Sequence, residues 1–76
     1  MKKKLDTLYL SLFAISDMAI QFKADSQYTQ SVIENILFFA WSDGLINGHQ
    51  YDEMAKQLNE DLEGFHSLMF KLIKFD

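Results

Sequence analysis

The feature that most constrains this chain is an uninterrupted run of six apolar residues, Ile36–Trp41. The residues before the run alternate between apolar and polar with helical spacing, which favours a helix over a strand for the run itself. A helix with apolar side chains on every side has to be enclosed by other helices or by a second chain. We therefore expect a helical protein in which this segment is central and covered on more than one face.

The size and composition indicate a single helical domain over residues 1–76. A chain of 76 residues is close to the size at which one core is only marginally sufficient. Hydrophobic residues make up 49% of it, including seven Phe, three Tyr and one Trp, so it either packs a dense aromatic core or keeps apolar surface for a partner. There is no Cys, and therefore no disulfide and no thiolate metal site. Because small secreted domains usually depend on such cross-links, we expect a cytoplasmic protein.

The charged residues argue against nucleic acid as a partner, and the lengths of the apolar stretches argue against a membrane-spanning helix. Seven basic and 11 acidic residues give a net charge of −4, and all seven basic residues are Lys. Arg, the residue best suited to phosphates and base edges, is absent, so we expect no nucleic-acid binding. No stretch approaches the roughly 18 apolar residues of a membrane-spanning helix. The basic and apolar start of the chain lacks the small-residue cleavage site of a signal peptide, so we expect it to be part of the fold.

Three segments are predicted to be helical: residues 3–23, 26–43 and 48–75. In the first, apolar residues recur at the spacing of an amphipathic helix: Leu5, Leu8, Leu12, Ile15, Ala19 and Phe22. A similar stripe in the third segment keeps its phase across Gly64, which favours one long helix there. The alternative is two shorter helices with a kink or break at Gly64.

The connections between these segments carry residues typical of helix ends. Asp25-Ser26 offers two candidate N-caps for the second helix. Gly44 is suited to the left-handed position after a helix, and Leu45-Ile46 would then turn inward. Asn47, with Gln50 three residues later, forms the pattern of a capping box. The sequence thus predicts an all-α fold, a small antiparallel three-helix bundle.

More apolar residues are present than a three-helix monomer can bury, so we expect the protein to be a homo-oligomer. Trp41 is expected to be either a core residue packed on the first helix or an exposed anchor beside Phe38. The predicted oligomer interface comprises Phe38, Phe39, Trp41, Phe65, Met69, Phe70 and Ile73.

The residues that could carry chemistry are few, and we expect neither an enzyme nor a bound metal or cofactor. His49 and His66 would lie roughly 25 Å apart on one continuous helix, too far to share a metal. Asp43-Gly44-Leu45-Ile46 is similar to the centre of a calcium-binding EF-hand loop, but the first, third and twelfth positions fall on Phe39, Trp41 and Gln50. Calcium needs several carboxylate oxygens there, so the calcium interpretation fails.

The same helix, Asp-Gly-x-Ile, helix outline resembles helical pairs in tellurite-resistance-type domains and in small bacteriocin immunity proteins. The likeness covers only the two helices on either side of this turn. It implies a pair of antiparallel helices and no particular function.

Acidic residues on the third segment, with one aromatic residue, form the predicted partner-binding set: Tyr51, Asp52, Glu53, Glu60, Asp61 and Glu63. Carboxylates at such a surface steer association with a basic partner. We therefore expect a small acidic protein that binds and inhibits or sequesters a larger, basic macromolecule, as bacterial immunity proteins and phage-encoded inhibitors of host defence do. Two alternatives are a self-associating structural or adaptor subunit, and an oligomer that encloses an anionic metabolite with Lys23, Ser26 and Tyr28.

Overall fold

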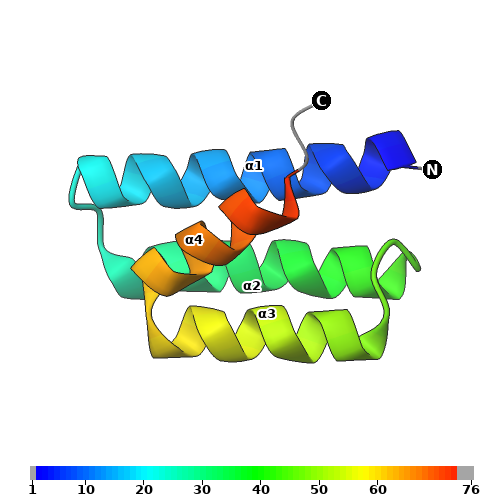
Figure 1. Ribbon diagram of the computed structural model, residues 1–76. Helices are drawn as coiled ribbons and strands as arrows, with labels where there is room; N and C mark the ends of the chain where they lie inside the picture. Colours follow the sequence, from blue (N-terminus) through cyan, green and yellow to red (C-terminus); the bar gives the residue numbers. More distant parts are fainter. Residues whose placement is uncertain (1, 74–76) are drawn as a thin grey trace.

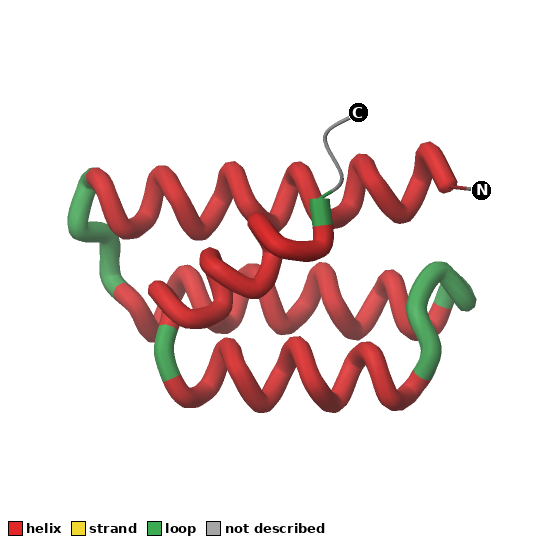
Figure 2. Tube along the Cα trace, viewed as in Figure 1, coloured by secondary structure: helices red, strands yellow, loops and turns green. Residues whose placement is uncertain are grey.

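The computed structural model describes residues 2–73, which form a flat layer of helices with one helix crossing it. The helices are α1 (Lys2–Gln21), α2 (Ser26–Ser42), α3 (Gly48–Glu60) and α4 (Leu62–Leu72). Figure 1 shows α1, α2 and α3 side by side in alternating directions, with α4 running obliquely across one face of that layer. The molecule measures 33 × 27 × 15 Å. No strand occurs in the described part of the chain, so the all-α prediction is confirmed (Figure 2).

The third predicted segment forms two helices, so the three-helix prediction is wrong and residues 2–73 form four. The break lies at Asp61, three residues before Gly64, where the backbone is extended (φ −169°, ψ 122°). The Asp61 carboxylate accepts a hydrogen bond from the Glu63 backbone N–H at 3.2 Å, so it caps α4 at the point where α3 ends. Aspartate favours such caps because its side chain satisfies N–H groups that a helix start leaves unpaired. Residues 74 and 75, the end of the predicted helix, lie outside the described residues.

Gly64 has a packing role instead of being the break itself. A Cβ atom at this position would collide with the side-chain amide of Gln57 on the last turns of α3. The absence of a side chain therefore allows the start of α4 to lie directly against the end of α3.

The turn before α2 contains the predicted N-cap. The Asp25 carboxylate accepts hydrogen bonds from the backbone N–H groups of Gln27 and Tyr28, at 2.9 and 3.1 Å. Asp25, and not Ser26, is therefore the N-cap of α2. The helix before this turn ends at Gln21, two residues earlier than predicted.

The core lies where α4 covers the layer, and it takes residues from all four helices. Side chains without any exposed surface are Leu12, Ser16, Ile33, Leu37, Leu58, Phe65 and Met69. The apolar run of α2 is covered on only part of its circumference, because Leu37 and Ala40 are buried whereas Phe38 and Phe39 are 50% and 70% exposed. The expectation that this helix is enclosed on several faces is thus met only in part, since the single crossing helix covers one side of the layer.

The predicted oligomer interface is divided by this arrangement. Phe65 and Met69 belong to the core of the single chain, with no exposed surface, so their assignment to an interface is wrong. Both lie on the side of α4 that faces the layer, and this follows from α4 being a separate helix that crosses it. Ile73 is partly buried against the same core, whereas Phe70 is 53% exposed.

Candidate functional site

Four neighbouring rings form an exposed aromatic strip, which we define as Phe39, Phe38, Trp41 and Tyr51. Their ring centroids are 6.4 Å apart for Phe38 and Phe39, 6.0 Å for Phe38 and Trp41, and 5.2 Å for Trp41 and Tyr51. The last pair is stacked, with 20° between the ring planes, and joins α2 to α3. Trp41 is 43% exposed, so it is not a buried core residue. The strip is the largest exposed group of aromatic side chains that contact one another in the described structure.

The loop between α2 and α3 brings Trp41 and Tyr51 together. Gly44 adopts a left-handed conformation (φ 79°), which an L-residue with a side chain adopts only at a cost. Ile46 is buried beneath the turn, and Asn47 and Gln50 form the predicted capping box at the start of α3. A Cβ atom at Gly48 would lie 3.9 Å from the indole nitrogen of Trp41, so the backbone of α3 begins beside the indole ring. These features fix the two helices at the distance that stacking requires.

The six residues of the predicted partner-binding set do not form one surface. Tyr51 is half-buried and belongs to the aromatic strip, and the five acidic residues are exposed. Asp52 and Glu53 are consecutive on α3, so they point about 100° apart. Glu53 lines a small cavity towards α1 and α4, whereas Glu60, Asp61 and Glu63 cluster at the junction of α3 and α4. Of the acidic residues in the predicted set, only Asp52 is adjacent in sequence to the aromatic strip.

A further carboxylate lies beside the aromatic strip and was missed by the sequence reasoning. Glu34 is exposed on α2 one turn before Phe38, on the same side of the helix. The four-residue spacing from Glu34 to Phe38 could have indicated this arrangement. Glu34 and Asp52, which directly follows Tyr51, form what we call the acidic rim. Asp43 is exposed at the end of α2 but lines a hollow with residues of α1, so it is not part of the rim.

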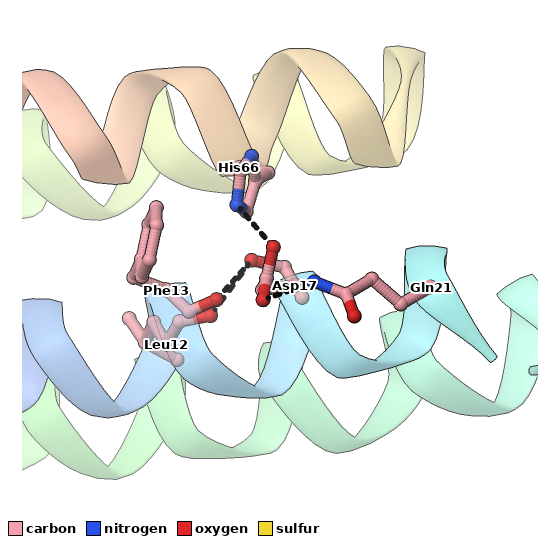
Figure 3. Close-up of polar contacts among 6 residues, drawn as sticks. Leu12, Phe13, Asp17, Gln21 and His66 are labelled. Carbon is pink, nitrogen blue, oxygen red and sulfur yellow. Dashed lines mark hydrogen bonds and ion pairs between the residues drawn. The ribbon is translucent and has the colours of Figure 1, made fainter.

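A second group of polar residues joins α1 to α4 (Figure 3). The His66 ring stacks on Phe13, with centroids 4.4 Å apart, and His66 Nε2 lies 3.2 Å from Asp17 Oδ1. The other oxygen of Asp17 accepts a hydrogen bond from the Gln21 amide at 3.0 Å. Ser16 Oγ is buried and donates to backbone carbonyls of its own helix, at 2.9 and 3.0 Å. This hydroxyl is therefore committed to structure and is not arranged as a nucleophile for His66.

The three residues predicted for an anionic ligand do not all line one hollow. Lys23 and Ser26 line a hollow of about 390 Å³, but three carboxylates line it as well: Glu60, Asp61 and Glu63. Tyr28 lines a different groove, between α1 and α2. Carboxylates beside a bound anion repel it, so this geometry does not favour the metabolite interpretation.

The two histidines lie in different surroundings. His49 is exposed and 3.8 Å from Glu53 on its own helix, whereas His66 is in the contact between α1 and α4. Among residues 2–73, no group of three or more His, Asp or Glu side chains is placed to hold a metal ion. None of the helices described is both long enough and apolar enough to cross a membrane.

Comparison with known proteins adds no family to this description. No protein-family model, no curated protein and no solved structure matches the chain.

Proposed function

We propose that this protein is a non-enzymatic binder, which inhibits or sequesters a larger, basic protein by covering part of its surface. The observation that carries the proposal is the aromatic strip bordered by the acidic rim. An exposed patch of contacting aromatic side chains is typical of a surface that binds another macromolecule. The acidic residues around it indicate the charge of the surface that it fits.

Trp41 and Tyr51 are the expected anchors of this interaction. Trp and Tyr are enriched among the interface residues that contribute most to affinity. Because the two rings already stack on each other at 5.2 Å, they lose little conformational freedom when a partner covers them. Complete burial of one large apolar side chain contributes about 1.5–3 kcal/mol. Phe38 and Trp41 are already partly buried in the single chain, so burial of their exposed parts by a partner contributes a fraction of that value for each.

The acidic rim is expected to act mainly on the rate of association and on the choice of partner. Glu34 and Asp52 are exposed, so each contributes little as an individual ion pair. Together with the net charge of −4, they attract a basic surface and repel an acidic one. The affinity should therefore fall as the salt concentration rises.

Affinity capture from a lysate of the source cells, with the purified protein as bait, tests the proposal. Trp41→Ala removes an anchor, and Asp52→Lys reverses a charge of the rim. Phe70→Ala is the matched control, because Phe70 is 53% exposed but lies on α4, outside the strip. Asp61 is left unchanged because it caps α4. Circular dichroism first establishes that all baits are equally helical.

The proposal predicts one basic protein that the wild type and Phe70→Ala capture in a fixed ratio and that both test variants lose. Binding should change the fluorescence of Trp41, the only tryptophan, and the activity of the captured protein should fall when the wild type is added. If no captured protein depends on Trp41, or if the captured protein is acidic, the proposal is wrong.

A further inference from the structure

A second apolar surface lies between α1 and α2, whereas the stacked rings of Trp41 and Tyr51 lie between α2 and α3. It is a groove of about 370 Å³. The described residues that line it are all uncharged: Ile15, Met18, Ala19, Phe22, Ala24, Tyr28, Thr29 and Val32. Phe22 and Tyr28 are 75% and 72% exposed, so their rings stand beside the groove and leave most of their surface in water.

This groove is on the face of the layer that α4 does not cover. Phe13 contacts His66 and Phe70 of α4. Phe22 directly follows α1, and its backbone N–H still donates to the Met18 carbonyl at 2.9 Å, as in a helix. It is nine residues beyond Phe13, about two and a half turns, so it points in the opposite direction. On α2, Phe39 follows Tyr28 by about three turns and extends the same apolar face. It is 70% exposed.

We infer that a second copy of this chain covers the groove, so that α1 and α2 of one copy pack on α1 and α2 of the other about a two-fold axis. A two-fold interface uses the same patch on both copies, so the patch has to be complementary to itself. This face has a groove and, directly beside it, projecting rings. Rotation by half a turn places the rings of each copy over the groove of its partner.

The exposed area is of the size that such a dimer requires. Met18, Phe22, Tyr28 and Phe39 are 59–75% exposed and together present roughly 400–600 Å². A standard stable interface buries about 800 Å² on each partner, including a polar rim. The four side chains thus supply about half or more of the area. The half-buried Ile15, Val32 and Ile36 lie between them.

The distribution of charge favours a second copy over a charged partner at this place. Two chains of net charge −4 repel each other, so they associate most easily where no carboxylates are brought together. The uncharged lining of the groove meets this condition, whereas the acidic rim beside Phe38 and Trp41 does not. The inference goes beyond the proposed function, because a dimer built on this face covers only Phe39 of the aromatic strip and leaves Phe38, Trp41 and Tyr51 of each copy open to a partner.

Sedimentation equilibrium from low micromolar to several hundred micromolar protein tests the inference. The wild type should move from 8.9 kDa towards twice that mass as the concentration rises. Phe22→Asp and Tyr28→Asp each place an unpaired charge in the interface and should raise the dissociation constant by more than about tenfold. Both side chains are largely exposed in the single chain, so circular dichroism and thermal unfolding at low concentration should remain unchanged.

Leu10→Asp is the matched control. Leu10 is 53% exposed on α1, but it lies about a third of a turn from Phe22 and does not line the groove. This variant should dimerise as the wild type does. A wild type that stays at 8.9 kDa over the whole range overturns the inference, and so does a dimer that Leu10→Asp weakens as much as Phe22→Asp. Trp41→Ala should leave the dimer intact, which separates this test from that of the proposed function.

Discussion

Truncation of Phe65 to alanine tests whether this side chain stabilises the core of the single chain, where the structure places it, or forms a contact between chains. Phe65 is completely buried, and it is the largest such side chain in the described core. Phe→Ala substitutions at such positions cost about 3–5 kcal/mol, the sum of lost burial and the cavity that remains. A domain of 76 residues is stable by roughly 4–11 kcal/mol. Phe65→Ala should therefore remove a large part of the stability, and Phe65→Leu should cost roughly 1–2 kcal/mol.

Phe70→Ala provides the comparison within the same helix. Phe70 is 53% exposed and contacts Phe13 with ring centroids 5.8 Å apart, so its truncation should cost about 1 kcal/mol or less. Urea unfolding followed by circular dichroism measures both values. At a slope of about 1–1.5 kcal/mol per molar urea, Phe65→Ala should lower the midpoint by roughly 3 M and Phe70→Ala by less than about 1 M. If Phe65→Ala costs no more than Phe70→Ala, or only dissociates an oligomer, Phe65 is not a core residue and the packing of α4 described above is incorrect.

Three further experiments test local features. Burial and the nearby Asp6 charge raise the pKa of the Tyr9 phenol above its ordinary 10.0, so the folded state keeps the proton that the unfolded state loses first. The free energy of unfolding should therefore fall as the pH rises from 10.0 through the raised pKa, and Tyr9→Phe should remove that part of the decrease in alkaline urea titrations. A double-mutant cycle of His66→Ala and Asp17→Ala should show a coupling of about 0.5–1 kcal/mol in favour of the pair, and purely additive effects would contradict the contact between α1 and α4. Asp61→Ala should cost about 0.5–2 kcal/mol through loss of the cap on α4, with Asp61→Asn recovering most of it; an unchanged urea midpoint for Asp61→Ala would contradict the capping role.

The periodic apolar pattern and the residues at the helix ends were sufficient to predict most of the secondary structure. The stripe from Leu5 to Ala19 is a helix, and Gly44 and the Asn47–Gln50 capping box end one helix and begin the next. These features depend on residues close together in sequence, so a single sequence contains the information. The break at Asp61 was missed because the apolar phase of the third segment continues through it, and periodicity alone outweighed the capping residue.

The candidate site could be predicted only in part, because most of it depends on contacts between helices. Exposed aromatic residues at Phe38 and Phe39 were expected from the apolar surplus, but their neighbours across helices were not. The stacking of Trp41 on Tyr51, the acidic rim and the uncharged groove beside Phe22 each depend on which sides of two helices face each other. A stripe on one helix does not specify its neighbour.

The sequence alone therefore determined that the protein is helical, where two of the three connections between its described helices lie, and that it carries more apolar surface than a small bundle needs. The tertiary structure decided which of these residues are core and which are surface. Phe65 and Phe70 are five residues apart on α4 and chemically identical, yet one is completely buried and the other is 53% exposed. The difference arises because α4 lies across one face of the layer, so only the side chains directed towards α1 and α3 are excluded from water. That direction depends on the turn at Asp61 and on the packing of α4 against its neighbouring helices, which the periodicity of one helix does not specify.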